Sequence, residues 1–113
     1  DGQICGGVAQ GIGTALFEEI PYDEYGQPQA STFADYHWPG PTSLPTFRIA
    51  HMVTPAEGTE YGMKGMGEGG AIAPPAAIAN AVRDALLSGG IDAEIGETPM
   101  TPRRIYNAIQ AAR

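Results

Sequence analysis

The chain has 113 residues, 16 of them glycine and 10 proline, and it carries a formal charge of −7. The length allows one domain, the glycine and proline content argues against a simple helical bundle, and the negative charge argues against nucleic acid or an anionic membrane surface as a partner. The single Cys5 excludes an internal disulfide and favours a reducing, cytoplasmic setting, and no apolar run is long enough to span a bilayer.

The first predicted element is a helix from Gln3 to Glu18. An apolar residue recurs every four positions along it, which indicates a stripe that must be buried. Four glycines lie in the same segment, and each disfavours a helix by about 0.8 to 1 kcal/mol relative to alanine. Close approach of another backbone or of a ligand would offset this penalty. We therefore predict that the glycine-bearing face of this helix is a packing or binding surface.

The middle of the chain is predicted to form short strands. Residues 20–23 and 32–36 resemble two strands of a hairpin, with a turn in which Gly26 takes the left-handed position. Residues 36–41 are expected to form an extended, aromatic-rich loop that packs on the core. Residues 47–53 alternate as a third strand and place His51 on its apolar face, which predicts a core or edge histidine and not a metal ligand.

Five glycines in ten residues, from Tyr61 to Gly70, surround a single carboxylate, Glu68. Glycine lets another molecule approach the main chain closely, so the pattern predicts a tight functional loop. The helix predicted next, residues 71–87, is entered through Pro74-Pro75, and its start would offer N–H groups and a positive dipole end to an anion. Two interpretations stay open: Glu68 is a general base beside an anion site, or it is a solvated glutamate in a flexible turn.

The last third of the chain predicts two helices. Residues 75–87 are apolar on nearly every side, which predicts a helix buried all round that ends at a glycine cap in residues 88–90. The final helix runs from Thr101-Pro102 to about Ala112, with threonine as its N-cap. The predicted fold class is α+β, with short mixed strands, a glycine-rich helix, a buried apolar helix and a C-terminal helix. Such burial needs more partner surface than the strands provide, so residues 1–113 are expected to be an incomplete segment of a larger domain or assembly.

Five motifs run in order through nearly the whole chain: GQICGGVAQGIG at 2–13, YDEYG at 22–26, GMGEGG at 65–70, AAIANA at 76–81 and TP at 101–102. In this order they resemble the C-terminal part of the molybdopterin-binding large subunit of the xanthine dehydrogenase family of molybdenum hydroxylases. That family includes aldehyde oxidases and aerobic carbon monoxide dehydrogenases. The Glu-Gly-Gly form at 68–70 is similar to the bacterial carbon monoxide dehydrogenase-like and aldehyde oxidase-like branch.

The resemblance implies a molybdenum hydroxylase active site in which Glu68 is the catalytic base. The implied cofactor is molybdenum-molybdopterin in its cytosine dinucleotide form, contacted by Gln3, Gly67, Gly69 and Gly70, with no metal ligand from this chain. The implied partners are the remainder of the molybdenum subunit and the subunits or domains that carry FAD and 2Fe-2S clusters. The implied reaction hydroxylates an electron-poor carbon of an aldehyde or N-heterocycle, or oxidises carbon monoxide. Family large subunits run to several hundred residues, so the chain is expected to be inactive alone.

A second hypothesis comes from a different functional class. The glycine-rich helix and the apolar helix could serve only subunit contacts in a noncatalytic assembly domain, with Glu68 in a structural role. Molybdenum and pterin content of the native assembly would separate the two hypotheses.

Overall fold

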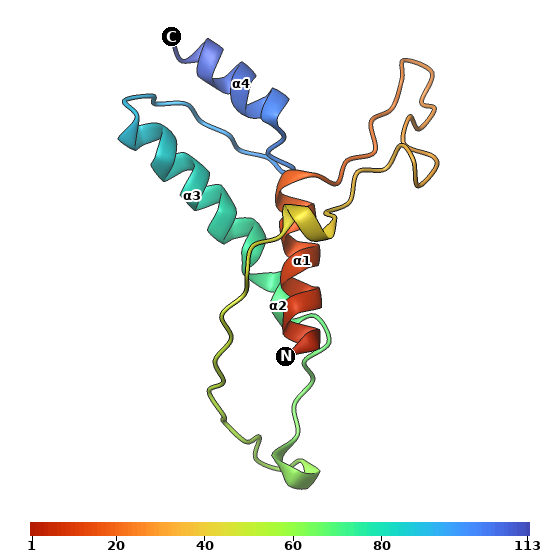
Figure 1. The fold of residues 1–113 in the computed structure, drawn as a ribbon, viewed down its shortest axis with the longest axis vertical. Helices are drawn as coiled ribbons and strands as arrows, with labels where there is room; N and C mark the ends of the chain where they lie inside the picture. Colours follow the sequence, from red (N-terminus) through yellow and green to blue (C-terminus); the bar gives the residue numbers. More distant parts are fainter.

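The computed structural model describes residues 1–113 as four α-helices and two 3-10 turns joined by long irregular segments. The helices are α1 (Gly2–Leu16), α2 (Gly69–Ile72), α3 (Pro74–Ser88) and α4 (Pro102–Ala111), and the 3-10 turns are η1 (Pro41–Ser43) and η2 (Glu60–Gly62). Figure 1 shows α1 at the centre, α2 beside it, and α3 leading away from α2. Two excursions, between α1 and η1 and between η1 and α2, project away from the helices. None of the helices combines the length and apolar character needed to cross a membrane.

The helix predictions are confirmed for α1 and α4 and need one correction between them. Thr101 caps α4 as expected, because its hydroxyl accepts a hydrogen bond from the Arg104 backbone N–H at 3.3 Å. The helix predicted over residues 71–87 is two helices, and the chain breaks between them at Ala73. Pro74 and Pro75 have no N–H group, so the hydrogen-bond ladder of α2 cannot continue into α3.

The predicted strands do not form, so the α+β description holds only in part and the chain is mostly helical where it is regular. The only β pairing is an isolated antiparallel bridge between Tyr22 and Pro28. The predicted turn between them is present, and Gly26 takes the left-handed conformation as expected, with φ 77°. Residues 32–36 form a turn instead of a strand, in which the Thr32 hydroxyl donates to Asp35 at 2.7 Å. Local side-chain hydrogen bonds of this kind compete with a β ladder.

Residues 47–53 are extended but unpaired, because no second strand lies beside them. The alternation predicted a core or edge histidine. His51 is instead exposed on the surface of an unpaired segment, with its Nε2 2.8 Å from Asp1 Oδ1. The aromatic loop before it does contact the end of α1, since the centre of the His37 ring lies 5.1 Å from that of Phe17, the residue that caps the helix.

The small core lies at the C-terminal end of α1. Its buried apolar residues are Ile12, Ala15, Ala93 and Met100, and the Met100 backbone N–H donates to the Ala15 carbonyl at 2.6 Å. Arg104 of α4 strengthens this junction, because its guanidinium pairs with Glu19. Only 8 of the 113 residues are buried, so the core is far smaller than the apolar content of the chain would allow.

The outer surface confirms that most apolar side chains lack cover. The accessible surface is 8378 Å², whereas a compact monomer of this mass exposes roughly 5,900 Å². The radius of gyration is 17.7 Å, against about 13 Å for a compact domain of this length. Helix α3 contains no buried residue, so the prediction of a helix buried all round is wrong within this chain. The other helices that it contacts are α1 and α2, and the irregular segment after it lies alongside, where the Arg83 guanidinium donates to the Ala93 carbonyl.

An apolar groove of about 520 Å³ runs between α1, the start of α3 and the segment after η1. Its walls are mostly aliphatic and aromatic, with Val8, Ile12, Leu16, Pro45, Phe47, Pro74 and Ile78 among them. Contiguous apolar surface of this kind is rarely left in contact with water.

We predict that the chain produced alone binds a hydrophobic dye and self-associates, because α3 and the groove have no internal cover. Dye fluorescence and light scattering over a dilution series provide the measurement. A dilute, monodisperse monomer that leaves the dye dark would contradict the prediction.

Candidate functional site

The glycine loop around Glu68 is attached to α1 by direct contact between two backbones. A Cβ atom built on Gly7 would lie 2.9 Å from the Gly70 Cα, and one built on Gly70 would lie 2.6 Å from the Ile4 carbonyl oxygen. Real side chains do not approach backbone so closely, so both positions require glycine. One turn later, a Cβ atom on Gly11 would lie 2.8 Å from the Pro74 ring. The prediction that the glycine face of α1 is a packing surface is therefore confirmed, and the packed elements are α2 and the start of α3.

Gln3 makes a second attachment between α1 and the loop. Its side-chain Nε2 donates to the Gly67 carbonyl oxygen at 2.6 Å, across 64 positions of sequence. The bond is made one residue before Glu68, while the Gly7 contact is made two residues after it. The backbone of Glu68 is thus fixed on both sides by α1.

Glu68 itself is exposed and its carboxylate makes neither a hydrogen bond nor an ion pair within the chain. It occupies the N-cap position of α2 but does not cap that helix with its side chain. The residue lines an open hollow of about 340 Å³ with Gly65, Met66, Gly67, Gly69 and Ile72. An unpaired carboxylate in such a place is free to accept a proton.

The loop also presents unused backbone donors. The N–H groups of Gly67, Glu68 and Gly70 donate to no acceptor in the chain. No side chain covers Gly67, since nothing lies within 4 Å of the Cβ position. A ligand with several polar acceptors can therefore approach this backbone closely.

One part of the sequence argument is corrected by the structure. The helix start expected to receive an anion begins with Pro74 and Pro75, whose missing N–H groups remove two of its donors. Pro74 also packs against Gly11 of α1, so this helix end faces protein and not the Glu68 hollow. The donors available to a ligand come from the loop itself.

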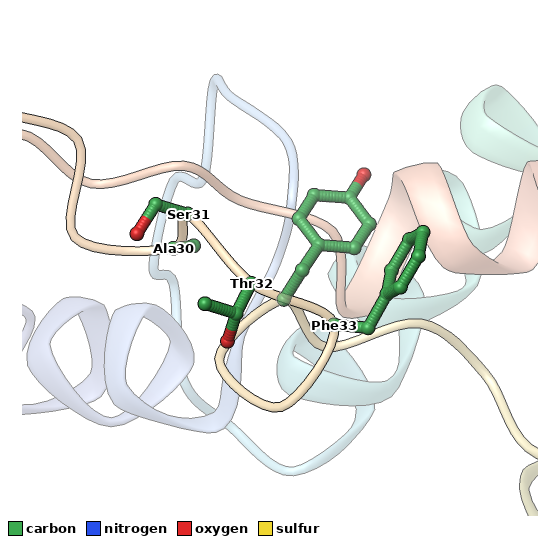
Figure 2. Close-up of a pocket in the computed structure, with 5 residues that line it drawn as sticks. Ala30, Ser31, Thr32 and Phe33 are labelled. Carbon is green, nitrogen blue, oxygen red and sulfur yellow. The ribbon is translucent and has the colours of Figure 1, made fainter.

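One other pocket lacks the chemistry of a reactive site. The pocket in Figure 2, about 380 Å³ in volume, is lined by Ala30, Ser31, Thr32, Phe33 and Tyr36. The Tyr36 hydroxyl donates to Glu18 at 2.5 Å, and this hydrogen bond, with some desolvation, raises the pKa of Tyr36. The only titratable side chain of the pocket, Tyr36, is thus held in the protonated form.

Comparison with known proteins places this geometry in a family. Residues 1–45 match the family described as molybdopterin cofactor-binding domain. The solved structure of quinoline 2-oxidoreductase from Pseudomonas putida 86 has a TM-score of 0.90 and 44% sequence identity, over 99% of this chain and 14% of that chain. The nicotine 6-hydroxylase large subunit of Paenarthrobacter nicotinovorans is 46% identical over 108 residues, which are 96% of this chain and 13% of the relative.

The chain belongs to the xanthine dehydrogenase family of molybdenum hydroxylases. A putative xanthine dehydrogenase molybdenum-binding subunit from Escherichia coli (strain K12) supports the same assignment, at 35% identity over 99% of this chain. The resemblance seen in the ordered motifs is thereby confirmed. The chain spans only about one seventh of the length of these relatives, 13 to 14%.

The sequence predicted Gln3, Gly67, Glu68 and the neighbouring glycines as a candidate site, but it did not predict how these residues are held together. Gly7 was recognised as a helix glycine and Gly70 as a loop glycine, and the sequence did not indicate that they touch. The available signal was the spacing of Gly7 and Gly11, which lie four residues apart on one helix face. A second glycine-rich segment elsewhere in the chain is the natural partner for such a face.

We predict that Gly70→Ala loosens the attachment of α2 to α1. Alanine favours a helix, but its Cβ would meet the backbone of Ile4 and Val8, which cannot move aside as a flexible side chain could. The free energy of local opening should fall by about 1 to 3 kcal/mol. Amide hydrogen exchange of residues 69–77 in the complete subunit measures it.

Gly65→Ala is the matched control, because nothing lies within 4 Å of its Cβ position and its φ is not positive. Its exchange rates should stay within the range of an ordinary surface substitution, about 0.5 kcal/mol. Equal effects of the two substitutions would contradict the packing argument.

Proposed function

We propose that residues 1–113 are the part of a molybdopterin-dependent oxidoreductase that supplies its general base, Glu68, and one wall of its cofactor site. The observation that carries the proposal is a carboxylate without internal partners, fixed between two attachments to α1 and surrounded by free backbone N–H groups. When bound, the molybdenum cofactor supplies the redox chemistry, and the chain's own residues bind, orient and move a proton.

The loop is chemically suited to such a cofactor. A pterin edge has several hydrogen-bonding groups, and the free N–H groups of Gly67 and Gly70 can serve its acceptors. Gln3 spends one amide donor on Gly67 and keeps its second N–H and its Oε1 for a ligand. Gly67 leaves its backbone uncovered, so that the ligand can come within hydrogen-bonding distance there, while the Met66 side chain lies beside Gly69 and α1 packs against Gly70.

The role of Glu68 follows from its surroundings. As general base, its carboxylate accepts the proton released when the oxygen nucleophile attacks an electron-poor carbon of the substrate. Met66 and Ile72 line the same hollow and give it two apolar side chains beside the carboxylate. We favour an N-heterocycle as the substrate class, since nicotine and quinoline appear in the names of similar proteins. An aldehyde or carbon monoxide is the alternative, because similar proteins at lower identity are named for these substrates.

The complete enzyme would also contain the remainder of the molybdenum subunit, which covers the groove and α3. Partner subunits or domains would carry FAD and 2Fe-2S clusters, and the cofactor would be the cytosine dinucleotide form. One similar protein is a large subunit, which supports an assembly of several subunits.

The open groove and the uncovered α3 favour a second candidate function, a noncatalytic assembly domain with a structural Glu68. The two candidates make opposite predictions for a substitution at Glu68. A structural glutamate stabilises the loop or the loaded cofactor, whereas a base acts only in turnover.

Glu68→Gln in the assembled enzyme should lower turnover per molybdenum atom by about 10²- to 10⁴-fold, because the amide keeps the size of the side chain but cannot accept the proton. Molybdenum and pterin content should remain near the native level. Glu24→Gln is the matched control, since Glu24 is exposed and lies outside the hollow, at a turn of the other excursion. A fully loaded Glu68→Gln enzyme that keeps more than about a tenth of the native rate would exclude Glu68 as the base.

Gln3→Ala should lower cofactor occupancy of the assembled enzyme, because it removes both the hold on the Gly67 carbonyl and the remaining amide groups. We expect a loss of about 1 to 3 kcal/mol in cofactor binding if polar groups are left buried and unpaired. Gln10→Ala is the control on the same helix, where the glutamine side chain is exposed and makes no hydrogen bond. Unchanged molybdenum and pterin content in Gln3→Ala would remove Gln3 from the site.

A further inference from the structure

Residues 52–64 form a lobe at the far end of the yellow-green excursion in Figure 1, remote from the helices and carrying η2 at its tip. We call this segment the Tyr61 lobe. The chain leaves it at Lys64 and reaches Glu68 four residues later. Any contact that fixes the lobe therefore also fixes the approach to the glycine loop.

The Tyr61 lobe is closed by its own hydrogen bonds. The Ala56 N–H donates to the Gly62 carbonyl at 3.0 Å, and the Thr59 hydroxyl donates to the Met63 carbonyl at 3.0 Å. At the base, Lys64 Nζ donates to the Thr54 hydroxyl at 2.8 Å. The lobe thus has a defined shape although it touches no helix.

Its largest side chains point away from the chain's own core. Met52, Val53 and Tyr61 are exposed to 94%, 83% and 88%, and Met63 is also exposed. A loop that has a defined shape and exposes apolar side chains to solvent is typical of a site that contacts another molecule or domain. Tyrosine and methionine are moreover side chains that interfaces favour.

Tyr61 also has an unusual backbone conformation. Its φ is 55°, in the left-handed region, and it is the only residue other than glycine in the chain with positive φ. Such a conformation is disfavoured for a bulky residue and is kept where the surrounding structure or a function requires it. Here it turns the exposed ring outward at the tip of the lobe.

We propose that the apolar side chains of the Tyr61 lobe, and not its carboxylates, insert into an apolar pocket of the remainder of the same subunit, so that the lobe holds the Glu68 loop at the reacting centre. The relatives are about seven times longer than this chain. The additional part of such a subunit would supply the surface that receives the lobe. A second copy of the chain is a poorer partner, because two lobes placed face to face would bring Glu57 and Glu60 of each against the other. The inference rests on the proposed function for its effect on turnover, but not for the insertion itself.

The methionines of the chain provide a direct test in the native, full-length enzyme. Peroxide converts an accessible methionine to its sulfoxide, and mass spectrometry measures the rate at each position. Met52 and Met63 should oxidise far more slowly in the native enzyme than after denaturation. Met100, which is buried within the chain, is the reference for full protection.

Native oxidation of Met52 and Met63 at the rate of the denatured chain would overturn the proposal. Protection that disappears when the enzyme is diluted into separate subunits would overturn it too, since another subunit or a second copy would then be the cover. Protection that survives dilution supports insertion into the same subunit.

Tyr61→Asn tests the tip, because asparagine tolerates the left-handed region but lacks the ring. Oxidation of Met63 should approach the denatured rate, and turnover per molybdenum should fall by about 10²-fold if the loop moves by about 1 Å. Tyr25→Asn, the same change at an exposed turn of the other excursion, should leave Met63 protected. An unchanged Met63 rate in Tyr61→Asn would overturn the role of the ring. The two proposals can fail separately. If Met52 and Met63 are protected but the Glu68→Gln variant keeps its rate, the proposed function is rejected and the insertion of the lobe is still supported.

Discussion

The contact between the backbones of α1 and α2, possible only because Gly7 and Gly70 lack side chains, is the constraint on which the candidate site depends. A four-residue helix such as α2 has no stability of its own. It is held because α1 accepts it at a distance that no other residue pair would allow, and because Gln3 holds the preceding carbonyl. The glycines that weaken α1 as a helix are thus the residues that make it a platform for Glu68.

Helix α1 serves two separate functions along its length. Its N-terminal half carries Gln3 and Gly7 and positions the glycine loop, whereas its C-terminal half carries Ala15 and binds the segment before α4. The few buried apolar side chains lie at the second end, so the site is built almost without a core of its own. This arrangement explains how a chain with so little buried surface can still define one loop closely: backbone contacts and one short hydrogen bond replace packed side chains.

The sequence correctly predicted the elements that local interactions determine. Its predictions were wrong for elements that depend on a partner elsewhere in the chain or outside it. Helices α1 and α4 were predicted because apolar spacing and a threonine cap are local signals, strong enough in α1 to outweigh its glycines. The alternation in residues 47–53 did not produce a strand, because a strand needs a neighbour to receive its hydrogen bonds. The prediction that α3 is buried was wrong for the same reason. The apolar pattern indicates that a surface packs against something, but it does not indicate which element packs there. For the site, glycine spacing and the family resemblance identified Glu68, but the bond from Gln3 to Gly67 joins positions 64 residues apart and leaves no local trace.

Glu68 departs from local rules in a way that supports a functional role. An N-cap position favours serine, threonine, aspartate or asparagine, whose short side chains reach the free N–H groups of the first turn. Glutamate stands at this position in α2, and its carboxylate does not make the capping bond. The helix therefore gains nothing from the side chain, and no ion pair elsewhere uses it. Residues that break local rules without stabilising the fold are expected at functional sites. The free N–H groups beside Glu68 would be the part of such a site that binds a ligand.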